Sequence, residues 1–248
     1  MPSGIVLPGP VPADVGIVAA LPIEVAPLIE RLKGVRRFRG PRSTVVEGEL
    51  HGRVVALIVT GMGRKRAQAG ADLLIAGHRP LLLLSAGYAG ALDPGLQRGE
   101  IVVPDRVVNV EGNSFEITTR PASAQGRRSG TLLTVDAVAR TAAEKADLRR
   151  IHGADLVDME TSAVAAFAAE RGTRFASIRV VSDDARSDLP REVLTITGET
   201  GGVRVGATFA AIWKRPAVVG DLLRMREQAM DASDRLAAFL EETIRSLG

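Results

Sequence analysis

Short apolar runs alternate along the chain with longer segments in which apolar residues recur every three or four positions. The first pattern is typical of buried strands and the second of helices with one buried face. We predict strands at residues 15–21, 43–50, 54–60, 81–85, 101–104, 107–110, 131–135 and 175–181. We predict helices at residues 22–34, 64–76, 142–150, 160–172 and 222–247. This alternation indicates an α/β fold, in which helices flank a central mixed, twisted and largely parallel β-sheet.

The segments between these elements predict a single domain. The Gly-rich stretch 86–92 is expected to be a turn, and the polar stretch 112–130 a loop. Residues 1–14 are rich in Pro and Gly and are expected to be a flexible N-terminal segment that does not resemble a signal peptide. No linker divides the remainder, so residues 15–248 are expected to form one domain. No apolar run approaches the roughly 20 residues of a membrane span, which makes a cytoplasmic protein the default expectation.

Composition excludes several classes of function. The net charge is only +3, from 32 basic and 29 acidic residues, and aromatic residues make up 3% of the chain, so nucleic-acid binding is not expected. The chain has no cysteine, which excludes disulfides, thiol catalysis and zinc–thiolate sites. Its three histidines are scattered and not spaced as ligands, so no metal site is predicted.

Two acidic residues stand where predicted strands end. Glu160 lies where a short apolar segment becomes an Ala-rich helix, and Asp183 follows the apolar run 177–181. In an α/β sheet, ligands bind beyond the carboxyl ends of strands. The two carboxyl groups are therefore candidates for a common site.

A set of motifs in a fixed order resembles the nucleoside phosphorylase and nucleosidase superfamily, and most closely its 5'-methylthioadenosine/S-adenosylhomocysteine nucleosidases. The resemblance covers residues 15–184 and rests on Glu24 after the first strand, Gly61-Met62-Gly63, the stretch 86–92, Gly99-Glu100-Ile101-Val102-Val103, Asp158-Met159-Glu160 and Val181-Ser182-Asp183. Each motif alone is weak, and their joint order is specific. The resemblance implies an enzyme that cleaves the N-glycosidic bond of a 5'-substituted adenosine, without a metal or organic cofactor.

The resemblance also implies a role for each matching residue. Asp183 matches the aspartate that protonates the purine, and Ser182 the serine that orients it. Glu160 matches the glutamate that binds the ribose hydroxyls, while Met159 packs under the sugar. Glu24 matches the glutamate that activates the attacking water. Cleavage needs these tasks because the base must be protonated, the sugar becomes cationic, and a nucleophile must attack C1'.

Several glycines match the turns that line the family's pocket near C1'. They are Gly61 and Gly63 after one strand, and Gly87 and Gly90 after another.

The chain departs from the family's pattern at two positions in the pocket. Tyr88 stands where the nucleosidases usually have Ser, and its ring is expected to narrow the pocket or contact the sugar. Val138 stands where that family stacks a Phe on the purine, so base stacking is expected to be weak or supplied by Phe115 or Tyr88.

Two features leave alternatives open for the reaction. The first is phosphorolysis, which the basic residues 64–66 keep open, although a carboxylate at Glu24 disfavours a phosphate anion there. The second is the substrate, because the tail 209–216 looks like the extension of hopanoid-associated nucleosidases, which remove adenine from adenosylhopane. That tail is equally consistent with a packing segment or a dimer contact. A homodimer is implied by the resemblance alone.

Structural roles also account for single residues of this set. A Glu in the first turn of a helix, such as Glu24 or Glu160, stabilises the helix dipole. Asp183 is equally suited to cap a helix, and Met159 to fill a core. A protein that binds nucleosides without cleaving them remains a further alternative. A dinucleotide-binding loop after Gly61 is excluded, because its third glycine is missing at Arg66.

Overall fold

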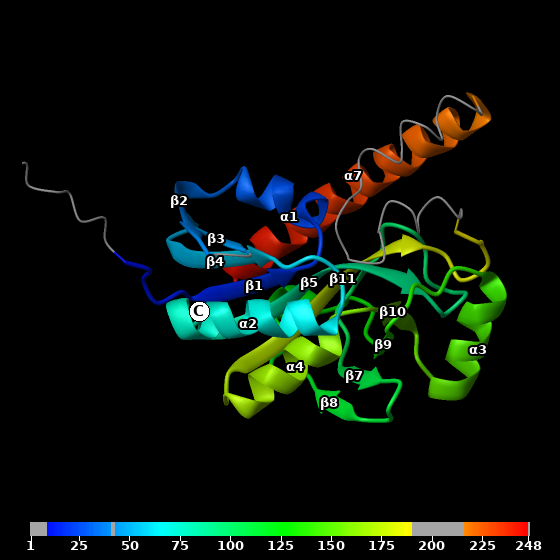
Figure 1. The fold of residues 1–248 in the computed structure, drawn as a ribbon, viewed down its shortest axis with the longest axis horizontal. Helices are drawn as coiled ribbons and strands as arrows, with labels where there is room; N and C mark the ends of the chain where they lie inside the picture. Colours follow the sequence, from blue (N-terminus) through cyan, green and yellow to red (C-terminus); the bar gives the residue numbers. More distant parts are fainter. Residues whose placement is uncertain (1–8, 41–42, 190–215, 248) are drawn as a thin grey trace, which may run out of the picture.

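The computed structural model describes residues 9–40, 43–189 and 216–247, and the side chains of the last range from residue 227 onward. The described residues form one sheet of 11 strands, with helices on both faces (Figure 1). The strands are β1 (Val15–Ala19), β2 (Lys33–Arg39), β3 (Thr44–Leu50), β4 (Arg53–Val59), β5 (Leu82–Ala91), β6 (Ile101–Val102), β7 (Arg106–Asn109), β8 (Ser114–Glu116), β9 (Thr131–Thr134), β10 (Leu156–Asp158) and β11 (Arg174–Asp183). The helices are α1 (Pro22–Ile29), α2 (Arg64–His78), the short 3₁₀ turn η1 (Ala122–Ala124), α3 (Ala142–His152), α4 (Thr161–Glu170) and α7 (Pro216–Arg245).

The sheet is mixed, as the sequence predicts. Its order is β2-β3-β4-β1-β5-β10-β9-β7-β8, and β11 pairs with both β5 and β6 off this path. Strand β1 runs parallel to β4 and β5, and β5 runs parallel to β11. Strand β10 is antiparallel to β5 and parallel to β9. The parallel strands β1, β5 and β11 therefore end on the same side, and β10 reaches that region from the opposite direction.

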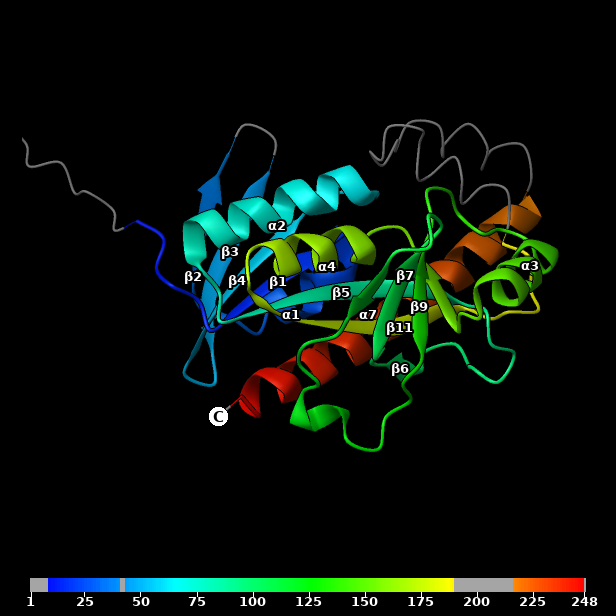
Figure 2. The same cartoon turned by 90° about the horizontal axis from the view of Figure 1, so that it is seen from below.

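Helices cover the two faces of the sheet in pairs. Helices α1 and α7 lie on one face, and α2 and α4 on the other (Figures 1 and 2). Because successive strand residues point to opposite faces, Ile17 packs into the core with Leu240 of α7. The next residue, Val18, packs with Leu74 of α2. The continuous apolar runs of the sequence thus correspond to strands that are buried on both faces.

The first predicted helix is shorter than expected. It begins at Pro22, as predicted, but ends at Ile29 and not near residue 34. The segment that follows is the edge strand β2, which pairs with β3 and was not predicted. An edge strand buries little surface, and β2 carries four Lys or Arg side chains that are suited to an unpaired edge. A strand of this kind has no strong apolar pattern to reveal it.

The predicted Gly-rich turn at 86–92 is wrong, because most of it is strand. Strand β5 continues to Ala91 and pairs with β11 along this stretch. The glycines mark places where side chains of other elements approach the strand closely, which is a common reason for Gly inside a strand. The loop predicted at 112–130 also contains the short strand β8 and the turn η1.

The remaining predicted elements are close to those observed. Helix α2 extends to His78, and α3 to His152. The last helix, predicted from residue 222, already begins at Pro216. Among the described residues, no helix combines the length and apolar character needed to cross a bilayer.

Candidate active site

A cavity of about 580 Å³ lies where β5, β10 and β11 meet α1, α7 and the segment before α3. Its size is typical of small-molecule sites. Eight of the ten site residues predicted from the sequence line it: Glu24, Tyr88, Gly90, Val138, Met159, Glu160, Ser182 and Asp183. They come from segments up to 159 residues apart in the sequence, as Glu24 and Asp183 are. The structure therefore brings all three predicted carboxyl groups to one cavity.

Glu24 lies in the first turn of α1 and is held by backbone N–H groups. Its Oε2 accepts hydrogen bonds from the N–H groups of Ala20 at 2.9 Å and Leu21 at 2.7 Å. Its Oε1 accepts one from the N–H group of Tyr88 at 2.9 Å. Burial raises the pKa of Glu24 above its ordinary value, although these hydrogen bonds act in the opposite direction. A buried carboxylate with a raised pKa is suited to accept a proton.

Gly87 is needed where it stands, next to Glu24. A Cβ atom at this position would lie 2.6 Å from Glu24 Oε1, which is closer than atoms can approach. Gly87 does not itself line the cavity, so its place is behind the carboxyl group and not beside the expected sugar.

Glu160 is the residue directly before α4. Its Oε1 accepts a hydrogen bond from the N–H group of Gly63 at 2.7 Å, and its Oε2 one from that of Met159 at 3.2 Å. Burial, and then the charge of Asp158, raise the pKa of Glu160 to about 8. Burial therefore favours the protonated form of the Glu160 carboxyl group. Gly63 acts here as a donor that positions the carboxyl group.

Asp183 ends β11 and is held by side chains. Its Oδ1 accepts a hydrogen bond from Ser182 Oγ at 2.6 Å, and Ser182 Oγ also lies 3.2 Å from the carbonyl oxygen of Ala89. The ammonium group of Lys145 lies 2.6 Å from Oδ2. Oδ2 has no aligned hydrogen-bond donor among the described residues, so the Lys145 contact is an ion pair without a linear hydrogen bond. A Cβ atom on Gly90 would lie 3.2 Å from Oδ2, so a larger residue there would crowd this oxygen.

A buried polar network, absent from the sequence predictions, lies beneath the cavity. Arg179 is 2% exposed, and its Nη2 donates to Asp158 Oδ2 at 2.9 Å and to Ser85 Oγ at 2.6 Å. Thr161 bonds to both Arg179 and Asp158, and Thr134 donates to Asp158 at 2.8 Å. The Asp158 carboxylate compensates the buried charge of the Arg179 guanidinium group, and removal of either partner would leave an unpaired buried charge.

This network bears directly on the carboxyl groups of the cavity. The positive charge of Arg179 lowers the pKa of both Glu24 and Glu160, against the larger effect of burial. The sequence did contain a signal, since Arg179 is a charged residue inside the apolar run 177–181. A charge in a buried strand is rare unless a partner compensates it.

Tyr88 connects the cavity to α7. Its hydroxyl group lies 2.6 Å from Ser233 Oγ and donates to the carbonyl oxygen of Ala229 at 2.8 Å. Burial raises the pKa of Tyr88 to about 12, so the phenol stays neutral. Helix α7 contributes Ala229 and Ala232 to the cavity wall. The Tyr88 ring therefore forms part of this wall and fastens it to the last helix.

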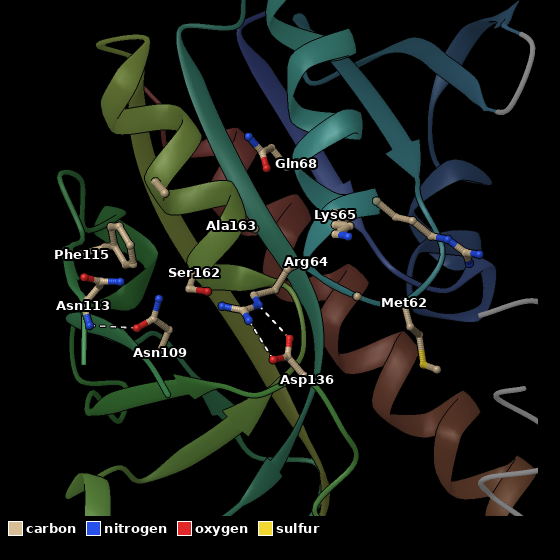
Figure 3. Close-up of a pocket in the computed structure, with 13 residues that line it drawn as sticks. Met62, Arg64, Lys65, Gln68, Asn109, Asn113, Phe115, Asp136, Ser162 and Ala163 are labelled. Atoms are coloured by element: carbon tan, nitrogen blue, oxygen red, sulfur yellow. Dashed lines mark hydrogen bonds and ion pairs between the residues drawn. The ribbon is translucent and has the colours of Figure 1, made fainter. Parts of the chain in front are cut away.

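A second depression, of about 650 Å³, lies next to α2 and α4 and shares Met62 with the first cavity (Figure 3). Its floor carries Arg64, which is paired with Asp136 at 2.8 Å and with Glu111 at 2.8 Å. Phe115 lines this depression and not the cavity with the three carboxyl groups, so the expectation that Phe115 stacks on the base is wrong. Gly63 also lines this second depression.

Among the described residues, no group of three or more His, Cys, Asp or Glu side chains is arranged to hold a metal ion. The predicted tail 209–216 lies outside the described residues, apart from Pro216 at the start of α7.

Comparison with known proteins finds relatives along most of the chain. The chain is 27% identical over 199 residues to a 5'-methylthioadenosine/S-adenosylhomocysteine nucleosidase from Baumannia cicadellinicola, covering 70% of this chain and 87% of that protein. It is 26% identical over 200 residues to the nucleosidase of the same name from Staphylococcus saprophyticus, covering 70% of this chain and 88% of that protein.

Solved structures of similarly named proteins share the fold. The nucleosidase from Neisseria meningitidis, in complex with methylthio-immucillin-A, superposes with a TM-score of 0.73 at 19% identity, covering 94% of this chain and 99% of that one. The nucleosidase from Campylobacter jejuni gives a TM-score of 0.75 at 18% identity, covering 95% and 100%.

The family model described as "Phosphorylase superfamily" matches residues 14–127 and 123–212, which is most of the chain. The first matched range includes Glu24, and the second includes Glu160 and Asp183. The chain belongs to the phosphorylase superfamily.

Proposed function

We propose that this protein hydrolyses the N-glycosidic bond of a 5'-substituted adenosine to adenine and the substituted ribose. The observation that carries the proposal is the meeting of Glu24, Glu160 and Asp183 in one cavity of a size suited to a nucleoside. Support comes also from the relatives, which are named 5'-methylthioadenosine/S-adenosylhomocysteine nucleosidases. A protein that only binds nucleosides would not need a carboxyl group at each of three chemically distinct positions.

Asp183 is the acid that protonates the leaving base, with Ser182 orienting it. The bond from the sugar to the base breaks with its electron pair moving to the purine, and a proton on a ring nitrogen makes the purine a better leaving group. Asp183 is almost fully buried, at 5% exposure, so solvent competes little for this proton. Its carboxyl group lines the cavity in which the base is expected to bind.

Glu160 binds the ribose hydroxyl groups, and Met159 packs beside the sugar. A carboxylate accepts two hydroxyl hydrogen bonds well, whereas a protonated carboxyl group accepts them poorly. Because burial raises the pKa of Glu160, hydrogen bonds from the ribose hydroxyl groups favour its ionised form against this effect. The negative charge then lies next to the sugar as the sugar becomes cationic.

Glu24 takes a proton from the attacking water. Its raised pKa makes it a stronger base than an exposed glutamate. Three backbone N–H groups hold its carboxyl group in one orientation. The nearby positive charge of Arg179 partly opposes the rise in the pKa of Glu24.

Hydrolysis is favoured over phosphorolysis by the charges around the cavity. Arg98 is the single Lys or Arg among the described lining residues, and it bonds to Gln228 of α7. The basic residues 64–66, which kept phosphorolysis open, line the second depression. A phosphate dianion beside Glu24 would therefore meet a carboxyl group, and the one cationic side chain among the described lining residues is already bonded to Gln228.

The 5'-substituent is the part of the substrate left open. Part of the cavity wall is apolar and made of small or aliphatic side chains: Ile23, Leu189, Ala229 and Ala232. This wall favours an apolar substituent, of which methylthio is the smallest in question. A bulkier lipid-like group, as in adenosylhopane, is the second candidate, and it rests on this wall and on the resemblance of the tail to hopanoid-associated nucleosidases.

A homodimer in the cytoplasm completes the proposal. Both the assembly and the location follow from the resemblance to the nucleosidases. Light scattering coupled to size-exclusion chromatography measures the assembly directly, and a monomer at micromolar concentration would contradict it.

The test is release of free adenine from methylthioadenosine, S-adenosylhomocysteine, adenosine and adenosylhopane, each with and without phosphate. Release that does not depend on phosphate is expected, with the 5'-substituted compounds preferred over adenosine. Release that requires phosphate and yields a ribose 1-phosphate would contradict hydrolysis. Adenine binding without release from any nucleoside would indicate a binding protein instead.

A further inference from the structure

Lys145 is a fully buried charge that the roles described so far leave unused. It lies in the second turn of α3, and its side chain has no exposed surface. A buried ammonium group is costly unless it is paired. Lys145 does not stabilise α3 either, because a positive charge near a helix N-terminus interacts unfavourably with the helix dipole. Thr141 and Glu144 already cap this helix. The reason for Lys145 therefore lies in what its Nζ atom contacts.

The contacts of Lys145 Nζ are with the last residue of β11 and with the segment that follows it. The ammonium group lies 2.6 Å from Asp183 Oδ2 and donates to the carbonyl oxygens of Asp184 at 2.7 Å and Ser187 at 3.1 Å. An ammonium group has three N–H bonds, and three acceptors surround it here. One side chain thus contacts both the carboxyl group that faces the base and the backbone that leads away from it.

We propose that Lys145 is the positioning residue for Asp183, holding its carboxyl group toward the base and stabilising the charge that Asp183 carries after proton transfer. This inference rests on the proposed function. When the base leaves, the O–H bond of Asp183 breaks and an N–H bond forms on the purine. Asp183 becomes a carboxylate, which lies against the Lys145 ammonium group. The proton that Glu24 takes from water replaces it, through solvent, before the next turnover.

The contacts around Lys145 separate this role from a purely structural one. Arg140, at the start of α3, also contacts the segment after β11, because its Nη1 donates to the carbonyl oxygen of Leu189 at 3.1 Å. Arg140 does not contact Asp183. A variant at Arg140 therefore loosens the same segment without removing the charge beside the acid, which makes it a matched control.

The first experiment compares Lys145→Met with Arg140→Gln in adenine release from the best 5'-substituted adenosine. Lys145→Met is expected to lower kcat by roughly 10- to 100-fold, the effect of a misplaced catalytic group, with a much smaller change in KM. Arg140→Gln is expected to stay close to wild type. Equal effects of the two variants, or a Lys145→Met variant with wild-type kcat, would overturn the proposal. A wild-type protein that releases no adenine would instead contradict the proposed function.

The second experiment uses binding alone and asks whether Lys145 acts through Asp183. Adenine affinity is measured by calorimetry for wild type, Lys145→Met, Asp183→Asn and the double variant. Lys145→Met is expected to weaken adenine binding in the wild-type background and to have little effect when Asp183 is already Asn. The double variant lacks both buried charges and is expected to unfold at a higher temperature than Lys145→Met. Equal, additive effects in both backgrounds would contradict a role through Asp183.

The absence of cysteine allows a direct test of the charge. Lys145→Cys introduces a single thiol, which is alkylated in denaturant before refolding, with wild type treated in the same way. Bromoethylamine restores an ammonium group at nearly the length of lysine, whereas iodoacetamide gives a neutral side chain of similar size. Recovery of kcat with the ammonium adduct alone is expected, and equal recovery with both adducts would show that only the volume matters.

Discussion

The two sides of the cavity hold their carboxyl groups in different ways. Glu24 and Glu160 accept their hydrogen bonds from backbone N–H groups in the turn before α1, in β5, in the turn before α2 and directly after β10. Asp183 is held by two side chains, the hydroxyl group of Ser182 and the ammonium group of Lys145. The first pair surrounds the expected sugar and water, and Asp183 faces the expected base.

The two kinds of hydrogen-bond donor suit the carboxyl groups of one cavity to two different chemical tasks. Backbone donors position a carboxyl group but bring no full charge, so burial dominates and the pKa of Glu24 and of Glu160 is raised. A raised pKa suits a group that must take up a proton or respond to the substrate. A neighbouring ammonium group instead stabilises the carboxylate that remains after a proton is given away.

The largest effect on activity is expected from substitution of Asp183, whose carboxyl group is held by side chains. Asp183→Asn keeps the shape of the side chain but removes its proton donor, and adenine release is expected to fall by about 10²- to 10⁴-fold. The measurement is kcat, with circular dichroism to verify folding. Asp184→Asn is the control, because Asp184 does not line the cavity and its side chain bonds to Ser187 and to the backbone N–H group of Arg186. Near-normal turnover in Asp183→Asn would remove the basis for treating this side as the acid.

The backbone-held side is tested through the glycine behind it. Gly87→Ala would place a Cβ atom 2.6 Å from Glu24 Oε1 and displace the carboxyl group, so kcat is expected to fall by roughly 10²-fold. Gly77→Ala is the matched control, because a Cβ atom there meets nothing within 4 Å. Gly77 lies inside α2, so that control is expected to gain about 1 kcal/mol of stability. Unchanged kcat in Gly87→Ala would mean that Glu24 tolerates displacement.

The smallest expected effect is a pH dependence of stability on the same side. Unfolded Glu160 loses its proton near its ordinary pKa of 4.5, whereas the folded protein keeps the proton up to a pKa of about 8. Between these two pKa values the folded state therefore binds more protons than the unfolded state. The contribution of Glu160 to the free energy of unfolding falls as the pH rises through that interval. Glu24, also with a raised pKa, acts in the same direction.

The readout is the difference between wild type and Glu160→Gln, because other groups also titrate. Without ligand, the melting temperature of wild type is expected to fall more than that of the variant between about pH 5 and about pH 8.5. Each ~2 kcal/mol of stability that depends on proton binding corresponds to several degrees of melting temperature. Parallel curves for the two proteins would show that Glu160 ionises in the folded state as freely as in solvent.

The sequence predicted the parts of this molecule that follow local rules. The buried strands and their alternation with helices gave the α/β fold, and the ends of the strands gave Glu160 and Asp183 as one site. The edge strand β2 was missed because it buries too little to carry an apolar pattern. The Gly-rich part of β5 was mistaken for a turn, because Gly87 and Gly90 accommodate Glu24 and Asp183 from distant elements.

The supporting charges were missed for a related reason. Arg179 meets Asp158, and Lys145 meets Asp183, only when α3, β10 and β11 have come together. The spacing of these pairs along the sequence matches neither the helix period nor the strand period, so the sequence alone does not indicate that they meet. Both are nonetheless charged residues that the fold buries almost completely, which is the property that points to a function once the structure is known.

The hydrogen bonds of Tyr88 have a practical consequence for following ligand binding. Tyr88 is the sole tyrosine of the chain, and it joins the cavity wall to α7 through its hydroxyl group. The chain also has a single tryptophan, Trp213, so Trp213→Phe leaves Tyr88 as its only strongly absorbing near-ultraviolet chromophore. The fluorescence and near-ultraviolet dichroism of that variant would report from inside the site itself. Occupancy of the cavity and movement of the last helix would thus be visible in solution without any attached label.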